Sequence, residues 1–470
     1  MSDEEREYLD DFRPETYERF MEGVHLDETR YFDVTEFEEI VDYMLDEGNF
    51  ELVRTALDHA LQIHPNAPTL ILRHAQWLIN HDEPVKALAE LKNLAALEQS
   101  NPDIPLMQGN AHLMLDQPTE AAIYFKRSLE IAEDETDDLL YIIGSAYITY
   151  GDLETAAEYL EKSYAENKFN DAVIYELGYL WDQLGSPEKS IECYNLYLDL
   201  DPFNASVWFN LGIAYNRIMA FEKAIEAYDF TLALNDEFFH AIFNKANSLA
   251  NLSRFKEAIL AYRDYLKKDS ENDDAHCYIG ECYLKLGRNK MAIRFYNKAI
   301  RLNPQNSVAW FSTGLIHWMN RDYADGITSL KKAIQHESDN AEYWFVLGRL
   351  LRDHGDFNEA RTAFKRATAL DPANSDMWIY FAEYLHSVGN VDDAIVTLKR
   401  GNRHNSDSAV IKYHLAAYLL ERNDVSAAVG ELENALKLDF SKHYDLFEVF
   451  PKAILNDSVN KLIREYKTHQ

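Results

Sequence analysis

Six residues in the middle of the chain define a spacing that returns along most of its length. They are Trp208, Leu211, Gly212, Tyr215, Ala224 and Tyr228, in the pattern W-x2-L-G-x2-Y…A-x3-Y. Part of this pattern returns with a period of about 34 residues. Each copy has two small residues followed by a large aromatic one: Gly178, Ser190 and Tyr194; Gly280, Ala292 and Tyr296; Gly348, Ala360 and Phe364. A fixed period of this length predicts a helix–turn–helix unit that stacks on copies of itself.

The frame also predicts how the two helices of one unit meet. With Trp208 at position 4, position 8 is glycine or alanine in most units, and position 20 is mostly alanine. We therefore expect these two small positions to face each other, as Gly212 and Ala224 would, and position 24 to supply a large apolar side chain such as Tyr228. The units would start at Val34, Pro68, Pro102, Asp137, Asp171, Ala205, Phe239, Asp273, Ser307, Ala341, Ser375 and Ala409, with one extra residue in the unit at Pro102.

Glycine and proline mark the ends of the expected helices. Glycine occupies position 15 in six units, where the first helix would stop and a positive φ is tolerated. Proline occupies position 32 in four units, where it would end the second helix because it cannot continue one.

This pattern resembles the tetratricopeptide repeat family over residues 34–442. The resemblance implies an all-α fold, a right-handed superhelical solenoid of about twelve tetratricopeptide repeats. We expect three regions: an acidic, aromatic-containing N-terminal extension at 1–33, the repeats at 34–442, and a C-terminal capping helix at 443–470. In the last region, Asp457 is the expected N-cap, and Val459, Leu462 and Ile463 share one apolar face.

The N-terminal extension is both acidic and aromatic. Residues 1–67 hold 20 acidic and 5 basic side chains, and six aromatic residues are interleaved among the first 33: Tyr8, Phe12, Tyr17, Phe20, Tyr31 and Phe32. We expect an ordered extension that is partly helical around Pro14–Met21. The alternative is a disordered acidic tail.

The net charge and the number of cysteines indicate which classes of partner and which cellular compartment to expect. The net charge of −34 repels phosphates and anionic lipids, so nucleic acid and membrane are not expected partners, whereas basic proteins or peptides are. Acidity that only keeps the protein soluble is the other interpretation. Three sparse cysteines, the lack of an apolar N-terminal signal and the lack of a long apolar stretch favour a reduced, cytoplasmic protein.

No motif for catalysis, metal binding or nucleotide binding appears. The histidines are scattered, Cys277 and Cys282 do not have the spacing of a zinc or redox site, and no glycine-rich phosphate loop occurs. We therefore expect no enzyme activity, no cofactor and no metal. The expected function is that of a scaffold or adaptor. The alternatives are a regulatory subunit that inhibits or positions a partner enzyme, and an enzyme with an unrecognised site.

The resemblance implies a concave groove lined by positions 2, 5, 6, 9, 12 and 13 of each repeat, where a peptide or protein segment of a partner binds. Position 5 carries aromatic residues that include Tyr175, Phe209 and Phe243, although repeat packing alone would also use them. Polar groove positions in neighbouring repeats carry Asn210, Asn216, Arg217, Asn244, Asn247, Asn251 and Lys285. An asparagine ladder of this kind can hold a peptide backbone because the amide both donates and accepts hydrogen bonds. A merely solvated polar face is the alternative.

One stretch of the repeats is less acidic than the rest. Residues 273–374 hold 14 basic and 12 acidic side chains, and Lys285, Arg349 and Arg352 fall at groove positions. We expect this stretch to receive an acidic ligand segment, or the N-terminal extension of the same or another copy.

Overall fold

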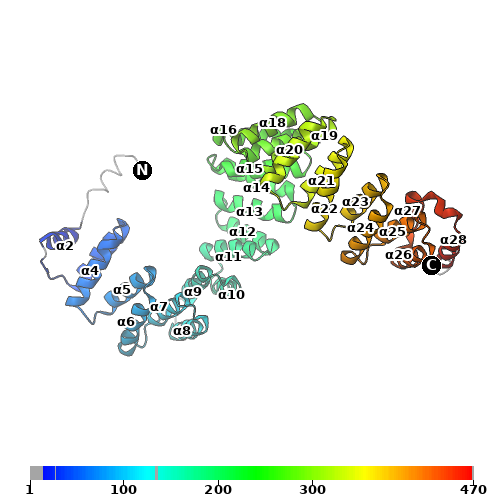
Figure 1. Ribbon diagram of the computed structural model, residues 1–470. Helices are drawn as coiled ribbons and strands as arrows, with labels where there is room; N and C mark the ends of the chain where they lie inside the picture. The colour runs from blue at the N-terminus through cyan, green and yellow to red at the C-terminus, as the bar shows by residue number, and fades with distance from the viewer. Residues whose placement is uncertain (1–13, 27, 133–135, 468–470) are drawn as a thin grey trace. The chain divides into compact units, whose positions relative to one another are not determined.

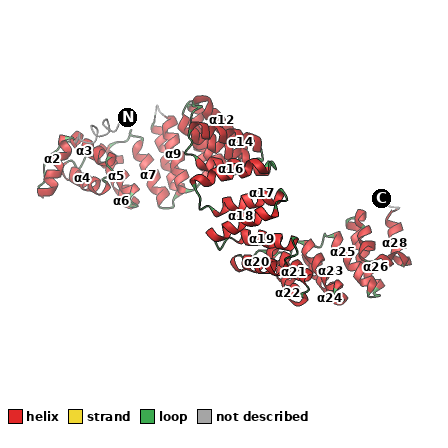
Figure 2. Ribbon diagram, turned by 90° about the horizontal axis from the view of Figure 1, so that it is seen from above, coloured by secondary structure: helices red, strands yellow, loops and turns green. Residues whose placement is uncertain are grey.

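The computed structural model describes residues 14–26, 28–132 and 136–467, and these residues form helices and loops without any strand (Figures 1 and 2). The all-α class expected from the spacing is therefore confirmed. The chain divides into two compact units, Met1–Asp236 and Glu237–Gln470, called unit 1 and unit 2 below. Within the described ranges, no helix has the length and hydropathy needed to cross a membrane.

Unit 1 consists of consecutive helices that pair antiparallel, each first helix with the second that follows it. Their bounds are α2 Glu15–Leu26, α3 Val34–Asp46, α4 Phe50–Ile63, α5 Pro68–Asn80, α6 Pro84–Leu97, α7 Asp103–Met114, α8 Pro118–Ile131, α9 Thr136–Tyr150, α10 Leu153–Glu166, α11 Asp171–Gln183, α12 Pro187–Leu200, α13 Ala205–Arg217 and α14 Phe221–Leu234.

Unit 2 continues the same alternation and ends in shorter elements. Its bounds are α15 Phe239–Asn251, α16 Phe255–Lys268, α17 Asp273–Lys285, α18 Asn289–Leu302, α19 Ser307–Met319, α20 Tyr323–His336, α21 Ala341–His354, α22 Phe357–Leu370, α23 Ser375–Ser387, α24 Val391–His404, α25 Ala409–Glu421, α26 Val425–Leu438, η1 Phe440–Lys442, α27 Tyr444–Val449, η2 Pro451–Leu455 and α28 Asp457–Lys467. The boundaries of the three regions expected from the sequence remain predictions.

The close approach inside a helix pair involves the large side chain at position 24 as well as the small residue at position 20. A Cβ placed on Gly212 would lie 2.5 Å from a ring carbon of Tyr228, so position 8 is small because the position-24 ring packs on it. Positions 8 and 20 also approach each other, since a Cβ on Gly314 would lie 3.3 Å from the backbone oxygen of Gly326, and the facing of Gly212 and Ala224 stays a prediction. Ala224 is fully buried beside the same interface.

The N-terminal helix α2 packs on the first pair. The rings of Phe20, Phe32 and Phe37 are buried, with centroids 6.0 Å apart for Phe20 and Phe32 and 5.4 Å apart for Phe32 and Phe37. The helix expected around Pro14–Met21 is present as α2. Tyr8 and Phe12 lie outside the described residues.

The C-terminal helix α28 begins with a different cap from the expected one. Asn456, not Asp457, accepts the N–H groups of Ser458 and Val459, at 3.1 and 3.2 Å. An amide oxygen one residue earlier reaches the free donors of the first turn, and Asp457 becomes the first residue of the helix. Val459 then packs in one apolar cluster with Leu419 and Leu432 of the last pair.

Candidate functional site

The expected groove residues of unit 1 are held by contacts between neighbouring repeats. Asn210 donates from its amide to the hydroxyl of Tyr175 at 3.3 Å, and Arg217 reaches both the carbonyl oxygen of Asp182, at 2.9 Å, and its carboxylate, at 3.0 Å. Burial raises the pKa of Asp182, and Arg217 opposes that rise. Each of these polar groups therefore has a structural partner on the helix of the preceding repeat.

Two further unit 1 residues lie against a buried ring. Asn216 donates to the hydroxyl of Tyr228 at 2.9 Å, and the ring of Phe209 lies 5.9 Å from that of Tyr228. Tyr228 is fully buried, and burial raises the pKa of its hydroxyl. Asn216 thus satisfies a hydroxyl that would otherwise lie unpaired in the interior.

In unit 2 the structure brings three of the expected residues into one hollow. Asn247, Asn251 and Lys285 line it together with Tyr262 and Tyr278. Asn247 accepts the hydroxyl of Tyr262 at 2.6 Å, and Asn251 donates to the backbone oxygen of Asn247 at 3.0 Å.

The other expected residues of this region lie outside that hollow. Phe243 packs on Tyr262, Tyr265 and Tyr278, with ring centroids 5.0 to 5.8 Å apart. Asn244 lies on α15 and is half-buried. The ladder that would connect Asn210 with Asn244 spans the two units and stays a prediction.

The two arginines of the expected basic stretch are engaged within the protein. The guanidinium of Arg349 lies over the rings of Trp318, Phe345 and Tyr380, at 4.9, 5.8 and 5.2 Å. Arg352 bonds to the carboxylate of Asp353 at 2.9 Å. These contacts reduce what either arginine can offer to an acidic ligand.

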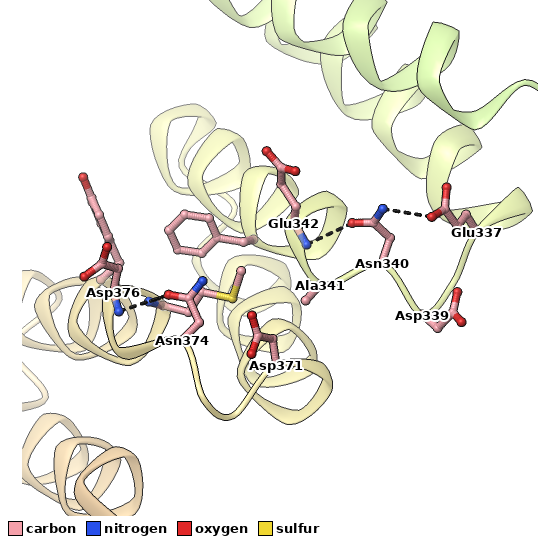
Figure 3. Close-up of a pocket in the computed structure, with 11 residues that line it drawn as sticks. Glu337, Asp339, Asn340, Ala341, Glu342, Asp371, Asn374 and Asp376 are labelled. Atoms are coloured by element: carbon pink, nitrogen blue, oxygen red, sulfur yellow. Dashed lines mark hydrogen bonds between the residues drawn. The ribbon is translucent and has the colours of Figure 1, made fainter. Parts of the chain in front are cut away.

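The same stretch of unit 2 carries a hollow of opposite charge, which we call the acidic hollow (Figure 3). Carboxylates come from two loop-and-helix junctions, α20 to α21 and α22 to α23, and two rings belong to its lining. Its members are Glu337, Asp339, Glu342, Asp371 and Asp376 with Phe345 and Tyr380, and Asn340, Ala341, Asn374 and Met377 complete it.

Helix capping explains the local position of two of these carboxylates, Glu342 and Asp376. Asn340 accepts the N–H groups of Glu342 and Tyr343 at 3.1 and 3.3 Å, and Asn374 repeats this arrangement one unit later with Asp376 and Met377. Figure 3 shows both caps at the rim, with Glu342 and Asp376 beside them. The first turn of a helix favours acidic residues, so the repeat places carboxylates here on local grounds.

Only one of the five carboxylates is strongly engaged. Glu337 accepts from the amide of Asn340 at 2.9 Å and from the hydroxyl of Ser307 at 2.7 Å, and these bonds lower its pKa. Asp339, Glu342, Asp371 and Asp376 have no ion pair with any described residue. The hollow therefore presents several uncompensated negative charges beside the rings of Phe345 and Tyr380, an arrangement suited to a cationic side chain.

The sequence interpretation missed this hollow. Carboxylates occur throughout the chain, so no acidic pair stood out. A combination of residues in the repeat frame could have indicated it. Asparagine at position 34 (Asn340) precedes an acidic residue at position 2 of the next repeat (Glu342). Aromatic residues stand at position 5 of that repeat (Phe345) and position 6 of the following one (Tyr380).

The cysteines offer poor nucleophiles. Burial raises the pKa of Cys277 to about 12 and the pKa values of Cys193 and Cys282 to about 11, so the thiols are protonated at neutral pH. Cys277 and Cys282 are buried. Among the described residues, no group of three or more potential ligands could hold a metal ion.

Family models match three stretches of the chain. A tetratricopeptide repeat model matches residues 273–306, and a second matches 141–205 and 175–235. The model of the cytochrome c-type biogenesis protein H tetratricopeptide domain matches 314–439. Together these matches span more than half of the chain, and the match at 273–306 coincides with the unit that the spacing starts at Asp273. A comparison with curated proteins finds no match.

Solved structures of tetratricopeptide repeat proteins are similar to part of the chain. The C-terminal part of a tetratricopeptide repeat protein from Cytophaga hutchinsonii is 17% identical, with a TM-score of 0.44, over 51% of this chain and 98% of that one. A tetratricopeptide repeat protein from Parabacteroides merdae is 18% identical, with a TM-score of 0.43, over 51% and 94%. PilF from Pseudomonas aeruginosa is 20% identical, with a TM-score of 0.39, over 45% and 97%.

The matched stretches cover helix pairs of both units, and the match at 273–306 has the bounds of one predicted repeat. Tetratricopeptide repeats are protein–protein interaction modules, which indicates the general class of function. The chain belongs to the tetratricopeptide repeat family.

Proposed function

We propose that this protein is a non-catalytic scaffold that binds a basic segment of a partner protein through the concave positions of its repeats. The observation that carries the proposal is the acidic hollow of unit 2, where five carboxylates lack a cationic partner among the described residues and two rings lie beside them. A lysine or arginine side chain seated there would gain charge complementarity, and it would lie near the two rings that the guanidinium of Arg349 also contacts.

The asparagine-lined hollow of unit 2 supports the same function. Asn251 is exposed, and Lys285 is exposed at the same hollow. The side chains of Asn251 and Lys285 could form hydrogen bonds with the backbone of a bound segment, while other parts of the groove contact its side chains. The contribution of Asn210, Asn216, Arg217, Asn244 and Asn247 to binding is part of this proposal.

The proposal is tested by titrating the full chain with a short peptide of arginine, lysine and serine. Glu342→Gln combined with Asp376→Asn removes two charges from the acidic hollow and should weaken binding by about 1–2 kcal/mol, roughly tenfold in Kd. Glu271→Gln combined with Asp325→Asn removes two exposed charges of unit 2 outside the hollow and is the control.

The control should leave the Kd within about twofold of the wild-type value. Equal weakening by both double variants would show attraction to the net charge alone and would refute the site. The same refutation follows if a peptide with glutamate in place of lysine and arginine binds as tightly as the basic one.

A further inference from the structure

Unit 1 contains an apolar hollow at groove positions of its first two repeats, away from the acidic hollow of unit 2 in the sequence. Helices α3, α4, α5 and α7 line it with Leu45, Phe50, Val53, Leu72, Trp77 and Met107. Leu45 is 43% exposed and Phe50 is 55% exposed, although both lie beside the buried core of the first pair. Large apolar side chains that remain this accessible beside one another are a common feature of interaction surfaces.

An acidic face of the same helix borders this hollow. Glu38, Glu39, Asp42 and Asp46 of α3 line the adjoining depression, and we call these four residues the acidic stripe. Their successive spacings are one, three and four residues, and the helical period brings all four to one side of α3 together with Leu45. Apolar and acidic surfaces are thus continuous along one helix.

The acidic stripe is only partly neutralised. Arg73, which lines both depressions, pairs through its guanidinium with the carboxylate of Asp42. Glu39 accepts the hydroxyl of Thr16 at 2.8 Å, and that bond removes none of its charge. Glu38 and Asp46 have no ion pair with residues of the described ranges. Four carboxylates therefore face a single guanidinium.

We infer that this surface docks a basic amphipathic segment of a partner protein, with an apolar side chain in the hollow and lysine or arginine side chains on the acidic stripe. The inference rests on the proposed function and deepens it, because Glu38, Asp42 and Leu45 stand at the groove positions 5, 9 and 12 of the first repeat. It adds a second place of binding in unit 1 and an apolar anchor. Charge complementarity selects the occupant: a second copy of this chain carries a net charge of −34, and residues 1–13 hold six acidic and two basic side chains.

The test uses the full chain and a fluorescent peptide with leucines at i, i+4 and i+7 and lysines elsewhere. Fluorescence anisotropy is measured at an ionic strength of about 0.15 M, where long-range attraction is largely screened. Glu38→Lys combined with Asp46→Lys reverses the free charges of the acidic stripe. Glu120→Lys combined with Glu158→Lys makes the same change of net charge at exposed sites on second helices of unit 1.

The stripe variant should weaken binding at least about tenfold, while the control should stay within about twofold. Leu45→Ser, at a half-exposed side chain that the fold does not need, should weaken binding by a similar factor because the apolar anchor loses its contact. Circular dichroism of each variant should match that of the wild type.

Three outcomes would overturn the inference. The first is an equal loss of binding in the stripe variant and its control. The second is equally tight binding of a peptide with serine in place of leucine. The third is a loss that occurs only with Glu342→Gln and Asp376→Asn, which would assign the peptide to the acidic hollow of unit 2 and leave the proposed function standing without a site in unit 1.

Discussion

Tryptophan indoles join successive repeats at one recurring place. Trp208, Trp310 and Trp378 stand at position 4, and each donates its Nε1 hydrogen to the carbonyl oxygen of the position-32 proline just before its repeat, at 2.9 to 3.0 Å. Proline lacks an N–H but keeps a strong acceptor. The sequence placed both residues in the frame, but their bond depends on how the chain turns between repeats.

The turn between the paired helices uses the left-handed region in every repeat, with or without glycine. Six glycines have a positive φ at position 15, and six other residues do so as well: Asp82, Asp116, Met219, Ser253, Arg321 and Asn423. The sequence analysis found only the glycines. The turn geometry is set by helix packing, so it imposes the same backbone on residues that disfavour it.

Met219→Gly should therefore stabilise the protein. Met219 has a φ of 58° and is exposed, so the substitution removes backbone strain and little packing. The expected gain is about 0.5–1 kcal/mol, and the thermal midpoint measured by calorimetry should rise. Gly185→Met is the reverse substitution at the equivalent turn of another repeat. Its φ is 70° and an added Cβ would meet no atom within 4 Å, so backbone strain alone should lower the thermal midpoint. A loss of stability in the first variant would show that the methionine side chain matters more than its backbone.

A buried histidine in the last repeat makes stability depend on pH. Burial lowers the pKa of His414 to about 4, so the folded protein keeps the ring neutral while the unfolded chain protonates it near 6.5. Stability from this group is therefore present above about pH 6.5 and is lost as the pH falls toward 4, by up to about 3 kcal/mol.

His414→Leu should reduce the fall in thermal midpoint between pH 7 and pH 5. The neighbouring carboxylate of Glu383 lies 4.0 Å from the ring, and burial raises its pKa, which acts with the opposite sign. Glu383→Gln separates the two contributions. An identical pH dependence in the wild type and His414→Leu would contradict the assignment.

Whole helices were easier to predict than their junctions. The frame places the starts of α13 at Ala205 and of α17 at Asp273, where the structure has them, because small and large residues recur with the packing of each pair. The acidic hollow was not predictable in the same way. It forms where Glu342 and Asp376, one repeat apart, come to the same surface, and that depends on how neighbouring repeats stack.

The capping role of α28 can be tested at a single residue. Val459 is fully buried against the last pair, so Val459→Asp would place a charge in the apolar cluster. We expect a loss of about 2–4 kcal/mol and fraying of the C-terminal pair. Hydrogen exchange should show α25 and α26 losing protection first. Leu455→Asp, at a side chain that is 81% exposed, is the control and should change little.

The net charge of the whole molecule should give salt two opposite effects. With 80 acidic and 46 basic side chains, the chain repels itself, and screening relieves that repulsion, since the Debye length falls from about 30 Å at 0.01 M to about 8 Å at 0.15 M. Exposed ion pairs weaken over the same range, but each contributes only about 0–1 kcal/mol.

We therefore expect the thermal midpoint to rise with sodium chloride over this range while the affinity for a basic peptide falls. Scanning calorimetry measures the first quantity and a titration at matched salt measures the second. Sucrose at equal osmolality is the control, since it changes solvent exclusion without screening charge. If midpoint and affinity fell together, ion pairs would outweigh self-repulsion in holding the repeats. If both rose, the peptide would be bound through apolar contacts, and the carboxylates of the acidic hollow and the acidic stripe would have no part in recognition.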